Sequence, residues 1–431
     1  MKRALLSLLL CGISWIGVSA QKTCGSNSTN LSCQIPVITT AAYPGTIGNP
    51  AAAFSSSFAT QLGQLPLLSS GSGVVLTLDK ALGVYVASEN LGPILTDRAQ
   101  TIGKHKLLLA FAFQKFVFNS IDGTNLNNVP FIFAAVHPGQ GQPAPTVGCN
   151  YPSVEIICLT QTDKISVNVN QYVALATFGL DSKTDISVIL PFERVALGVY
   201  AKGEQYFISA SQMAETQLPA PFTSYAPGSK SGVGDLYVNV KRLIWSGSDE
   251  KTHLSAGLLV RFPTGDALNY LGSGAYGFDP YAVFAYQAQR FSPHVRLGYQ
   301  FNTSTVLIPN FNSSGTFTGN SNLPGSFQYD FGVDAVVFKK IPTTVAGDFL
   351  GNYIVNAPVL VLQKNVPIPG YGASADTLHP VNNSYNSAQL SIGLKVKPWK
   401  DLILYGNVIF QLNNVGLRSE PVPLVGASYT F

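Results

Sequence analysis

The sequence predicts an all-β protein, a transmembrane antiparallel β-barrel, from three features of its composition. Only 11% of the 431 residues are Asp, Glu, Lys or Arg, whereas soluble proteins carry about 25%. The hydrophobic fraction is 46% and the mean hydropathy is +0.21, which excludes intrinsic disorder. Beyond the N-terminus, no run of roughly 18 apolar residues could form a spanning helix. A barrel reconciles these features, because alternate residues of each strand face lipid.

The first 20 residues have the features of a secretory signal peptide. Lys2 and Arg3 precede a mostly apolar stretch, and Val18, Ser19 and Ala20 give a small-residue cleavage site. We expect residues 1–20 to be removed on export. The formal charge of the whole chain is only +4, so the charge balance does not indicate a nucleic-acid partner.

Four cysteines follow the signal peptide and form two pairs, each nine residues apart: Cys24 with Cys33, and Cys149 with Cys158. In an exported protein this spacing favours two local disulfides. A zinc site would need closer cysteines or nearby histidines, so no metal is expected.

Residues 21–103 form an N-terminal segment that differs from the rest. Small residues and proline dominate up to position 73, and two short β-like pieces follow at 74–79 and 84–87. The segment could be a periplasmic extension, a plug inside the lumen, or an extra strand pair that makes a fourteen-stranded barrel. Asp97 and Arg98, just before the first barrel strand, could anchor it, or could be solvated turn charges.

The barrel is expected over residues 104–431, where segments alternate apolar with small or polar residues. In 387–396, Leu390, Ile392 and Leu394 share one face, and Ser391 and Gly393 lie on the other, which is the period of a strand. Twelve strands are expected at 104–119, 165–180, 185–206, 234–245, 252–263, 280–290, 294–303, 326–339, 343–362, 386–397, 400–412 and 420–431.

The connections between these strands alternate in length. Short turns are expected at 181–184, 246–251, 291–293, 340–342 and 398–399, and long loops at 120–164, 207–233, 264–279, 304–325 and 363–385. Outer-membrane barrels have short periplasmic turns and long extracellular loops, whereas a soluble sandwich has no reason to alternate. This pattern places the protein in the bacterial outer membrane, in contact with lipid and lipopolysaccharide. Aromatic residues near strand ends, including Trp245, Tyr281, Trp399 and Tyr405, are expected at the membrane interfaces.

The polar faces of the strands carry few charges, and these are expected to face the lumen, because a charge facing lipid costs about 2–4 kcal/mol. They could form a static ion-pair network or a constriction that selects solutes. The candidate lumen residues are Lys241, Arg261, Arg296, Asp330, Asp334 and Lys395.

The last strand places Val425, Ala427, Tyr429 and Phe431 on one face and ends on the aromatic Phe431. This ending resembles the signal that the barrel assembly machinery reads, which makes that machinery an expected partner.

No motif indicates an enzyme or a cofactor. Gly272, Gly274 and Gly277 match G-x-G-x-x-G, but a dinucleotide site needs this motif between a strand and a helix, and here it lies in a predicted loop. None of the five histidines lies in a recognisable nucleophile motif.

Three stretches of the sequence carry a resemblance to a known family: GPILTDRAQTIGKHKLLLAFAFQKFVFNSIDG (92–123), GVGDLYVNVKRLIW (232–245) and LSAGLLVRFPTGDALNYLGSG (254–274). They resemble an outer-membrane barrel family of probable components of a meta pathway of phenol degradation, which is similar to the long-chain fatty-acid transporter barrels. The resemblance implies a channel for small hydrophobic or aromatic compounds and supplies no catalytic residues. The alternative is a structural or adhesive barrel that acts through its extracellular loops, above all 120–164.

Overall fold

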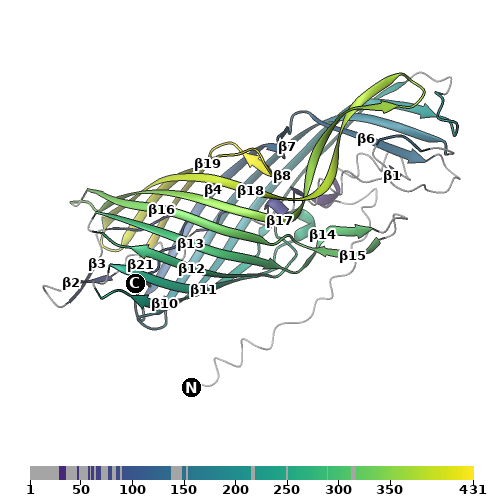
Figure 1. The fold of residues 1–431 in the computed structure, drawn as a ribbon. Helices are drawn as coiled ribbons and strands as arrows, with labels where there is room; N and C mark the ends of the chain where they lie inside the picture. The colour runs from purple at the N-terminus through teal and green to yellow at the C-terminus, as the bar shows by residue number, and fades with distance from the viewer. Residues whose placement is uncertain are drawn as a thin grey trace.

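The structure is a computed structural model, and it describes residues 29–34, 46–47, 57–58, 60–62, 65–68, 76–79, 84–87, 90–136, 148–151, 154–214, 219–248, 251–288, 290–311, 317–338 and 340–431. The predicted signal peptide and Cys24 lie outside these residues. Twelve long strands form the wall of the molecule (Figure 1). They are β4 (Leu107–Ile121), β7 (Ile156–Gly179), β8 (Thr184–Ile208), β10 (Leu236–Ser246), β11 (Thr252–Phe262), β12 (Gly277–Tyr286), β13 (Phe291–Asn302), β16 (Ser326–Phe338), β17 (Thr343–Ile368), β18 (Ala373–Trp399), β19 (Leu402–Gln411) and β21 (Val422–Thr430).

The twelve strands close into an antiparallel barrel, which confirms the predicted fold class. Each strand pairs with the next, and β21 returns to β4 with Leu424 opposite Gln114. Backbone hydrogen bonds in both directions between Leu107 and Phe431 complete the seam. The fourteen-stranded alternative is wrong, because β2 (Leu76–Asp79) and β3 (Val84–Ala87) pair only with each other in a separate two-stranded sheet.

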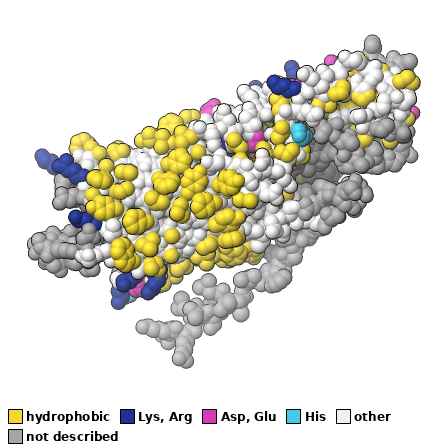
Figure 2. Space-filling view, in the orientation of Figure 1, with side chains coloured by type: hydrophobic (Ala, Val, Ile, Leu, Met, Phe, Trp, Pro, Cys, Tyr) yellow, Lys and Arg dark blue, Asp and Glu magenta, His cyan; other side chains and the backbone are white. Residues whose placement is uncertain are grey.

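The outer wall is apolar and the inner wall is polar, as the alternation predicts. On β13, for example, Leu297 and Phe301 are exposed, whereas Arg296 and Gln300, each directly before one of them, are buried. Figure 2 shows hydrophobic side chains spread over the barrel wall, with Lys and Arg gathered at the end that carries the short turns. Among the described residues, no helix is long and apolar enough to cross a bilayer.

The strands fall into two length classes, which separate the membrane part of the wall from an extracellular part. The strands β10, β12, β19 and β21 have 9 to 11 residues, close to the roughly 9–11 that span a bilayer. By contrast, β7, β8, β17 and β18 have 24 to 27 residues and extend beyond the other strands (Figure 1). They extend on the side of the long loops, which is therefore the extracellular side.

These extensions build an extracellular lobe from β6 (Val129–Val136), the first part of β7, the last part of β8 and the β17–β18 turn. The Ile132 N–H donates to Thr377 Oγ1 at 3.0 Å, and the Tyr371 hydroxyl donates to the Phe207 carbonyl at 2.8 Å. A small apolar core that includes Ile208 joins the two halves. The lobe is therefore a packed unit rather than a set of separate loops.

A disulfide between Cys149 and Cys158 lies in the core of this lobe, which confirms the second predicted pair. Cys33, in η1 (Leu31–Cys33), is also disulfide-bonded, and its predicted partner Cys24 lies outside the described residues.

Removing the lobe disulfide with Cys149→Ala and Cys158→Ala is expected to destabilise the lobe and leave the barrel intact. A crosslink closing a loop of this length restricts the unfolded chain and contributes about 2.5 kcal/mol. Limited proteolysis of the purified protein should show faster cutting within 137–163, with the heat-induced gel shift of the barrel unchanged. Equal cutting in the variant and the wild type would contradict this expectation.

Four predicted loops are wrong, because they contain regular strands. In 120–164 the chain forms β5 (Thr124–Asn125) and β6, and in 207–233 it forms β9 (Ala220–Val233). In 304–325 it forms the hairpin of β14 (Ser304–Phe311) and β15 (Phe317–Asn322), and in 363–385 it continues β17 and β18. The β9 sequence holds two prolines and two glycines, and its residues alternate only between half-buried and exposed. Such a strand lies outside the membrane and lacks the apolar face on which the prediction depended.

Two further expectations need correction. The turn predicted at 291–293 is wrong, since Pro293 lies inside β13, opposite Val333 of β16. Of the aromatic residues expected at the membrane interfaces, Trp245 and Trp399 are exposed, as expected. Tyr281 and Tyr405 are instead buried and point into the barrel. Their hydroxyls donate to Asn239 Oδ1 at 2.9 Å and to the Phe111 carbonyl at 3.2 Å.

Candidate functional site

The six candidate lumen residues all lie on the inner face of the barrel. Five of them are buried at the inward positions of their alternating strands, and Asp330, at an inward position of β16, is half-buried. They are Lys241 of β10, Arg261 of β11, Arg296 of β13, Asp330 and Asp334 of β16, and Lys395 of β18. The structure divides them into three groups: an ion cluster at mid-lumen, anchors for an N-terminal segment, and a network at the extracellular mouth.

Arg296 is the centre of the ion cluster at mid-lumen. Its guanidinium forms an ion pair with the fully buried Asp279 of β12 and lies 3.5 Å from Asp330 Oδ2. It also donates to Gln328 Oε1 at 2.6 Å and lies over the Tyr281 ring, 4.6 Å from its centre. Three strands are thus tied together by one cation inside the barrel.

Residues 90–102 pass through the lumen at the periplasmic end, and we call them the plug segment. Leu91, Ile94 and Ile102 are almost completely buried. The fully buried Lys395 ammonium donates to the carbonyls of Leu91, at 3.2 Å, and Pro93. On the opposite wall, Lys241 Nζ donates to the Arg98 carbonyl at 3.0 Å.

Further hydrogen bonds hold the plug segment around its circumference. The Leu91 N–H donates to Thr344 Oγ1 of β17 at 3.0 Å, and the Ile102 N–H donates to Asp185 Oδ2 of β8 at 3.1 Å. The Ser255 hydroxyl of β11 donates to the Ala99 carbonyl. Partners on opposite sides of the barrel therefore hold the segment across the lumen rather than along one wall.

His294 of β13 joins two carboxylates of the wall to Thr96 of the plug segment. Its Nδ1 lies 3.2 Å from Asp334 Oδ1, and its Nε2 lies 3.3 Å from Asp348 Oδ1 and 2.5 Å from Thr96 Oγ1. Gly332 makes this possible, because it lies between His294 and Asp348 in the sheet and a Cβ there would collide with both. Within the described part of the chain, no group of three or more His, Cys, Asp or Glu is placed to hold a metal ion.

The two residues predicted to anchor the N-terminal segment lie on opposite sides of the plug segment. The Asp97 carboxylate faces the ion cluster, 4.0 Å from Arg296 Nε. The Arg98 side chain is buried against Gly92 and is attracted by Asp334 and Asp185.

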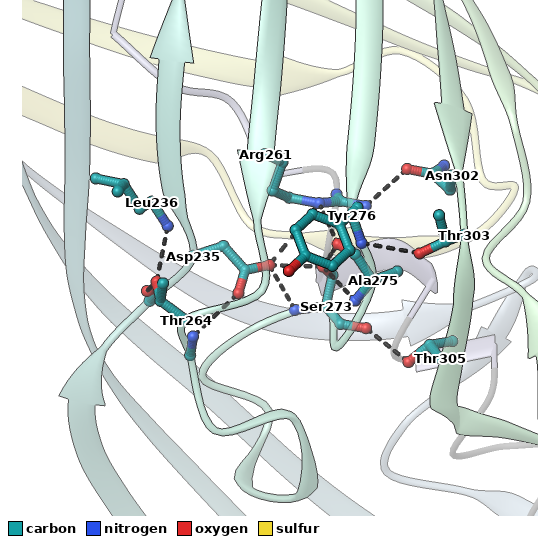
Figure 3. A network of polar contacts seen from close by, with 12 residues as sticks. Asp235, Leu236, Arg261, Thr264, Ser273, Ala275, Tyr276, Asn302, Thr303 and Thr305 are labelled. Carbon is teal, nitrogen blue, oxygen red and sulfur yellow. Dashed lines mark hydrogen bonds and ion pairs between the residues drawn. The ribbon is translucent and has the colours of Figure 1, made fainter. Parts of the chain in front are cut away.

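The third group closes the extracellular mouth (Figure 3). Asp235, between β9 and β10, lies 3.8 Å from Arg261 and accepts hydrogen bonds from the Ser273 N–H at 2.8 Å and the Ser273 hydroxyl at 2.6 Å. Arg261 also donates to Asn302 Oδ1 at 2.7 Å. These contacts fold the β11–β12 loop, with η2 (Ala267–Asn269), inward, and its Tyr270 ring packs edge-on against Phe58 at 4.8 Å. Gly272 and Gly274 of the G-x-G-x-x-G match lie in this loop, and Gly277 is the first residue of β12.

A cavity of about 220 Å³ lies in the lumen between the plug segment and the extracellular mouth. Its apolar lining includes Leu65, Phe116, Phe118, Ile189 and Leu350. Its polar lining includes Asp97, Arg261, Arg296, Asp330 and Arg418. The cavity is therefore amphipathic, with apolar side chains from β4, β8 and β17 and charged side chains from β11, β13, β16 and β20.

Sequence reasoning missed Arg418, Gln61 and residues 65–68, which all line the cavity. Arg418 lies in β20 (Leu417–Ser419), in a connection that had no strand pattern, and the other residues belong to a segment without periodicity. No local pattern could have identified them. Nearby, burial raises the pKa of the Asp122 carboxyl in the β4–β5 turn, while N–H groups of Leu360 and Gly416 stabilise its charged form.

A closed twelve-stranded barrel with a lipid-facing apolar wall and a polar, plugged lumen is an outer-membrane β-barrel protein. Residues 161–312 match the family described as putative MetA-pathway of phenol degradation. This confirms the resemblance over that part of the chain, which includes the second and third of the three quoted stretches. No curated protein matches the sequence.

Solved outer-membrane barrels are similar to the chain at low identity. An outer membrane channel from Pseudomonas putida F1 is 12% identical with a TM-score of 0.42, over 77% of this chain and 98% of that one. A FadL homologue from Pseudomonas aeruginosa is 8% identical with a TM-score of 0.32, over 76% and 89%. The NanC porin is 11% identical with a TM-score of 0.31, over 55% and 93%.

Proposed function

We propose that this protein is an outer-membrane channel for small hydrophobic or aromatic molecules, which pass through the lumen cavity. The observation that carries the proposal is the amphipathic cavity of about 220 Å³ inside the closed barrel. Sites for drug-sized ligands measure roughly 300–1,000 Å³ and are mostly apolar with a few polar groups. A cavity below that range, with Phe116 and Phe118 on one wall, suits a compound of one or two rings.

The lumen charges would have two different roles in such a channel. Arg261, Arg296 and Asp330 line the cavity and would select the solutes that enter it. Lys241, Asp334 and Lys395 lie against the plug segment and would hold it in place, together with Asp97 and Arg98. In this proposal a solute crosses only when residues 90–102 move out of its path.

Uptake into liposomes tests the proposed function. Vesicles that contain the purified protein should take up phenol and benzyl alcohol faster than they take up glucose, relative to vesicles without protein. No protein-dependent uptake of any solute in the panel would overturn the proposal.

The second candidate is a structural or adhesive barrel, and the packed extracellular lobe favours it. The lobe has its own apolar core and disulfide, which a simple pore does not require. Deleting residues 129–151 together with Cys158→Ser should abolish cell-surface binding if adhesion is the function. Retained binding, with solute uptake intact, would leave transport as the function.

The C-terminal strand supports a role for the barrel assembly machinery as a partner. The Phe431 side chain is 66% exposed on the lipid face, while its backbone is bonded to β4. Phe431→Ala is therefore expected to slow membrane assembly more than it destabilises the folded barrel. Pulse-labelled cells followed by the heat-induced gel shift would measure this, and a normal assembly rate would count against the partner.

A further inference from the structure

Arg418 differs from the other two arginines that line the cavity. Arg261 and Arg296 are each paired with carboxylates, whereas Arg418 has only amide oxygens as partners. Its Nη1 and Nη2 donate to Gln411 Oε1 and Asn413 Oδ1, both at 2.6 Å. In the described part of the chain Arg418 forms no ion pair, although only 3% of the residue is exposed to solvent.

The nearest acid does not neutralise this cation by direct contact. Asp122 attracts Arg418 electrostatically, but its carboxylate oxygens accept hydrogen bonds from the Gly416 N–H at 2.9 Å and the Leu360 N–H at 2.8 Å. A buried guanidinium without a carboxylate is a receptor for an anion, because a charged acceptor would restore the lost solvation.

Two buried hydrogen-bond donors beside the cavity lack an acceptor. They are Arg418 Nε and Gln61 Nε2, both without a partner among the described residues, and both residues line the cavity. The Gln61 amide lies against Gly416, two residues before Arg418, so the two donors belong to the same corner of the cavity. Buried donors are rarely left unpaired, and one ligand carboxylate could satisfy both.

The wall beside this corner is aromatic. In the pairing of β20 with β4, Ser419 lies opposite Phe118. The Phe118 and Phe116 rings stack, with centres 6.0 Å apart and planes 7° apart, and both line the cavity. The Arg418 cation and the two donors without an acceptor, its own Nε and Gln61 Nε2, therefore lie next to an aromatic surface.

We infer that the lumen cavity binds small aromatic carboxylates, with the carboxylate on Arg418 and Gln61 and the ring against Phe116 and Phe118. The inference rests on the proposed function, since it names the class of solute that the cavity prefers. It goes beyond that function in assigning a negative charge to the preferred ligand.

Calorimetric binding to the purified protein in detergent tests this inference, with benzoate as the probe and benzyl alcohol as its uncharged counterpart. The wild-type protein should bind benzoate about tenfold or more tightly than benzyl alcohol, since hydrogen bonds to charged groups are the stronger ones. Arg418→Gln should weaken benzoate binding about tenfold or more and leave benzyl alcohol unchanged. Gln61→Leu should weaken benzoate several-fold, and Arg194→Gln, an exposed arginine on β8, should change neither.

Each outcome decides the inference. Equal binding of the two probes by the wild type, or equal loss of both in Arg418→Gln, would overturn it. If Arg418→Gln fails to form the heat-resistant barrel, Gln61→Leu decides by whether benzoate binding alone falls. Uptake of benzyl alcohol without benzoate binding would overturn the inference and leave the proposed channel standing. Benzoate binding at Arg418 without uptake of either probe would support the inference and overturn the channel.

Discussion

Replacing Arg296 by Met is expected to lower the stability of the barrel by about 3–5 kcal/mol, the largest effect of any single substitution in the lumen. The change leaves Asp279, Asp330 and Asp97 facing one another in a closed lumen without the cation that pairs with all three. Methionine fills much of the arginine volume, so the loss reflects charge and hydrogen bonds more than packing. The temperature at which the folded band shifts on a gel measures it.

Two further variants separate this electrostatic effect from a general loss of packing. Arg194→Met removes an exposed arginine from the outer part of β8 and should shift the transition little. Adding Asp279→Asn and Asp330→Asn to Arg296→Met should recover part of the loss, because the uncompensated charges disappear. An unchanged transition temperature in Arg296→Met would show that water already screens these carboxylates, and the ion cluster would have no structural role.

The barrel could be predicted from the sequence because its determinants are local. Each spanning strand must alternate, since one face meets lipid and the other meets the lumen. The pattern in β13, β16 and β18 is therefore visible within about ten residues, and the register follows from it. Where the wall rises above the membrane, as in β9, lipid no longer imposes an apolar face, and the prediction failed there.

The inner positions of the charged residues could also be predicted, but their partners could not. Lys395 donates to Leu91, which precedes it by 304 residues, and no local pattern encodes such a contact. Tyr281 and Tyr405 show the same limit, because an aromatic residue near a strand end suits a membrane interface as well as a lumen. The pairing of their strands with the neighbouring strands determines that both tyrosines face the lumen.

Arg418, Gln61 and residues 65–68 could not be predicted, for a different reason. They lie in segments without alternation, and the closed barrel around them determines their burial. A cavity formed by two such segments and eight or more strands exists only in the folded molecule. The polar interior and its charged residues can thus be predicted from the sequence. Which of these charges are paired with carboxylates, and which are not, is determined by the fold.

Replacing both Lys241 and Lys395 by Met is expected to release the plug segment and raise the conductance of the channel. The two ammonium groups donate to the carbonyls of Leu91, Pro93 and Arg98, and methionine offers no donor in their place. Removing the ammonium groups also removes the cost of burying them. However, hydrogen bonds to charged groups contribute about 1.5–3 kcal/mol each. The loss of these bonds should therefore destabilise the bound position of residues 90–102 by more than the relief of burying the ammonium groups stabilises it.

Planar-bilayer recordings of the purified protein measure the effect. A change of 1.4 kcal/mol shifts a two-state population about tenfold, so the fraction of time spent in an open level should rise about tenfold or more. Lys397→Met is the matched control, because Lys397 lies on the same strand but pairs with Asp401 at the periplasmic turn. A folded double variant with wild-type conductance would show that the hydrogen bonds of His294, Thr344 and Asp185 hold the plug segment without the lysines.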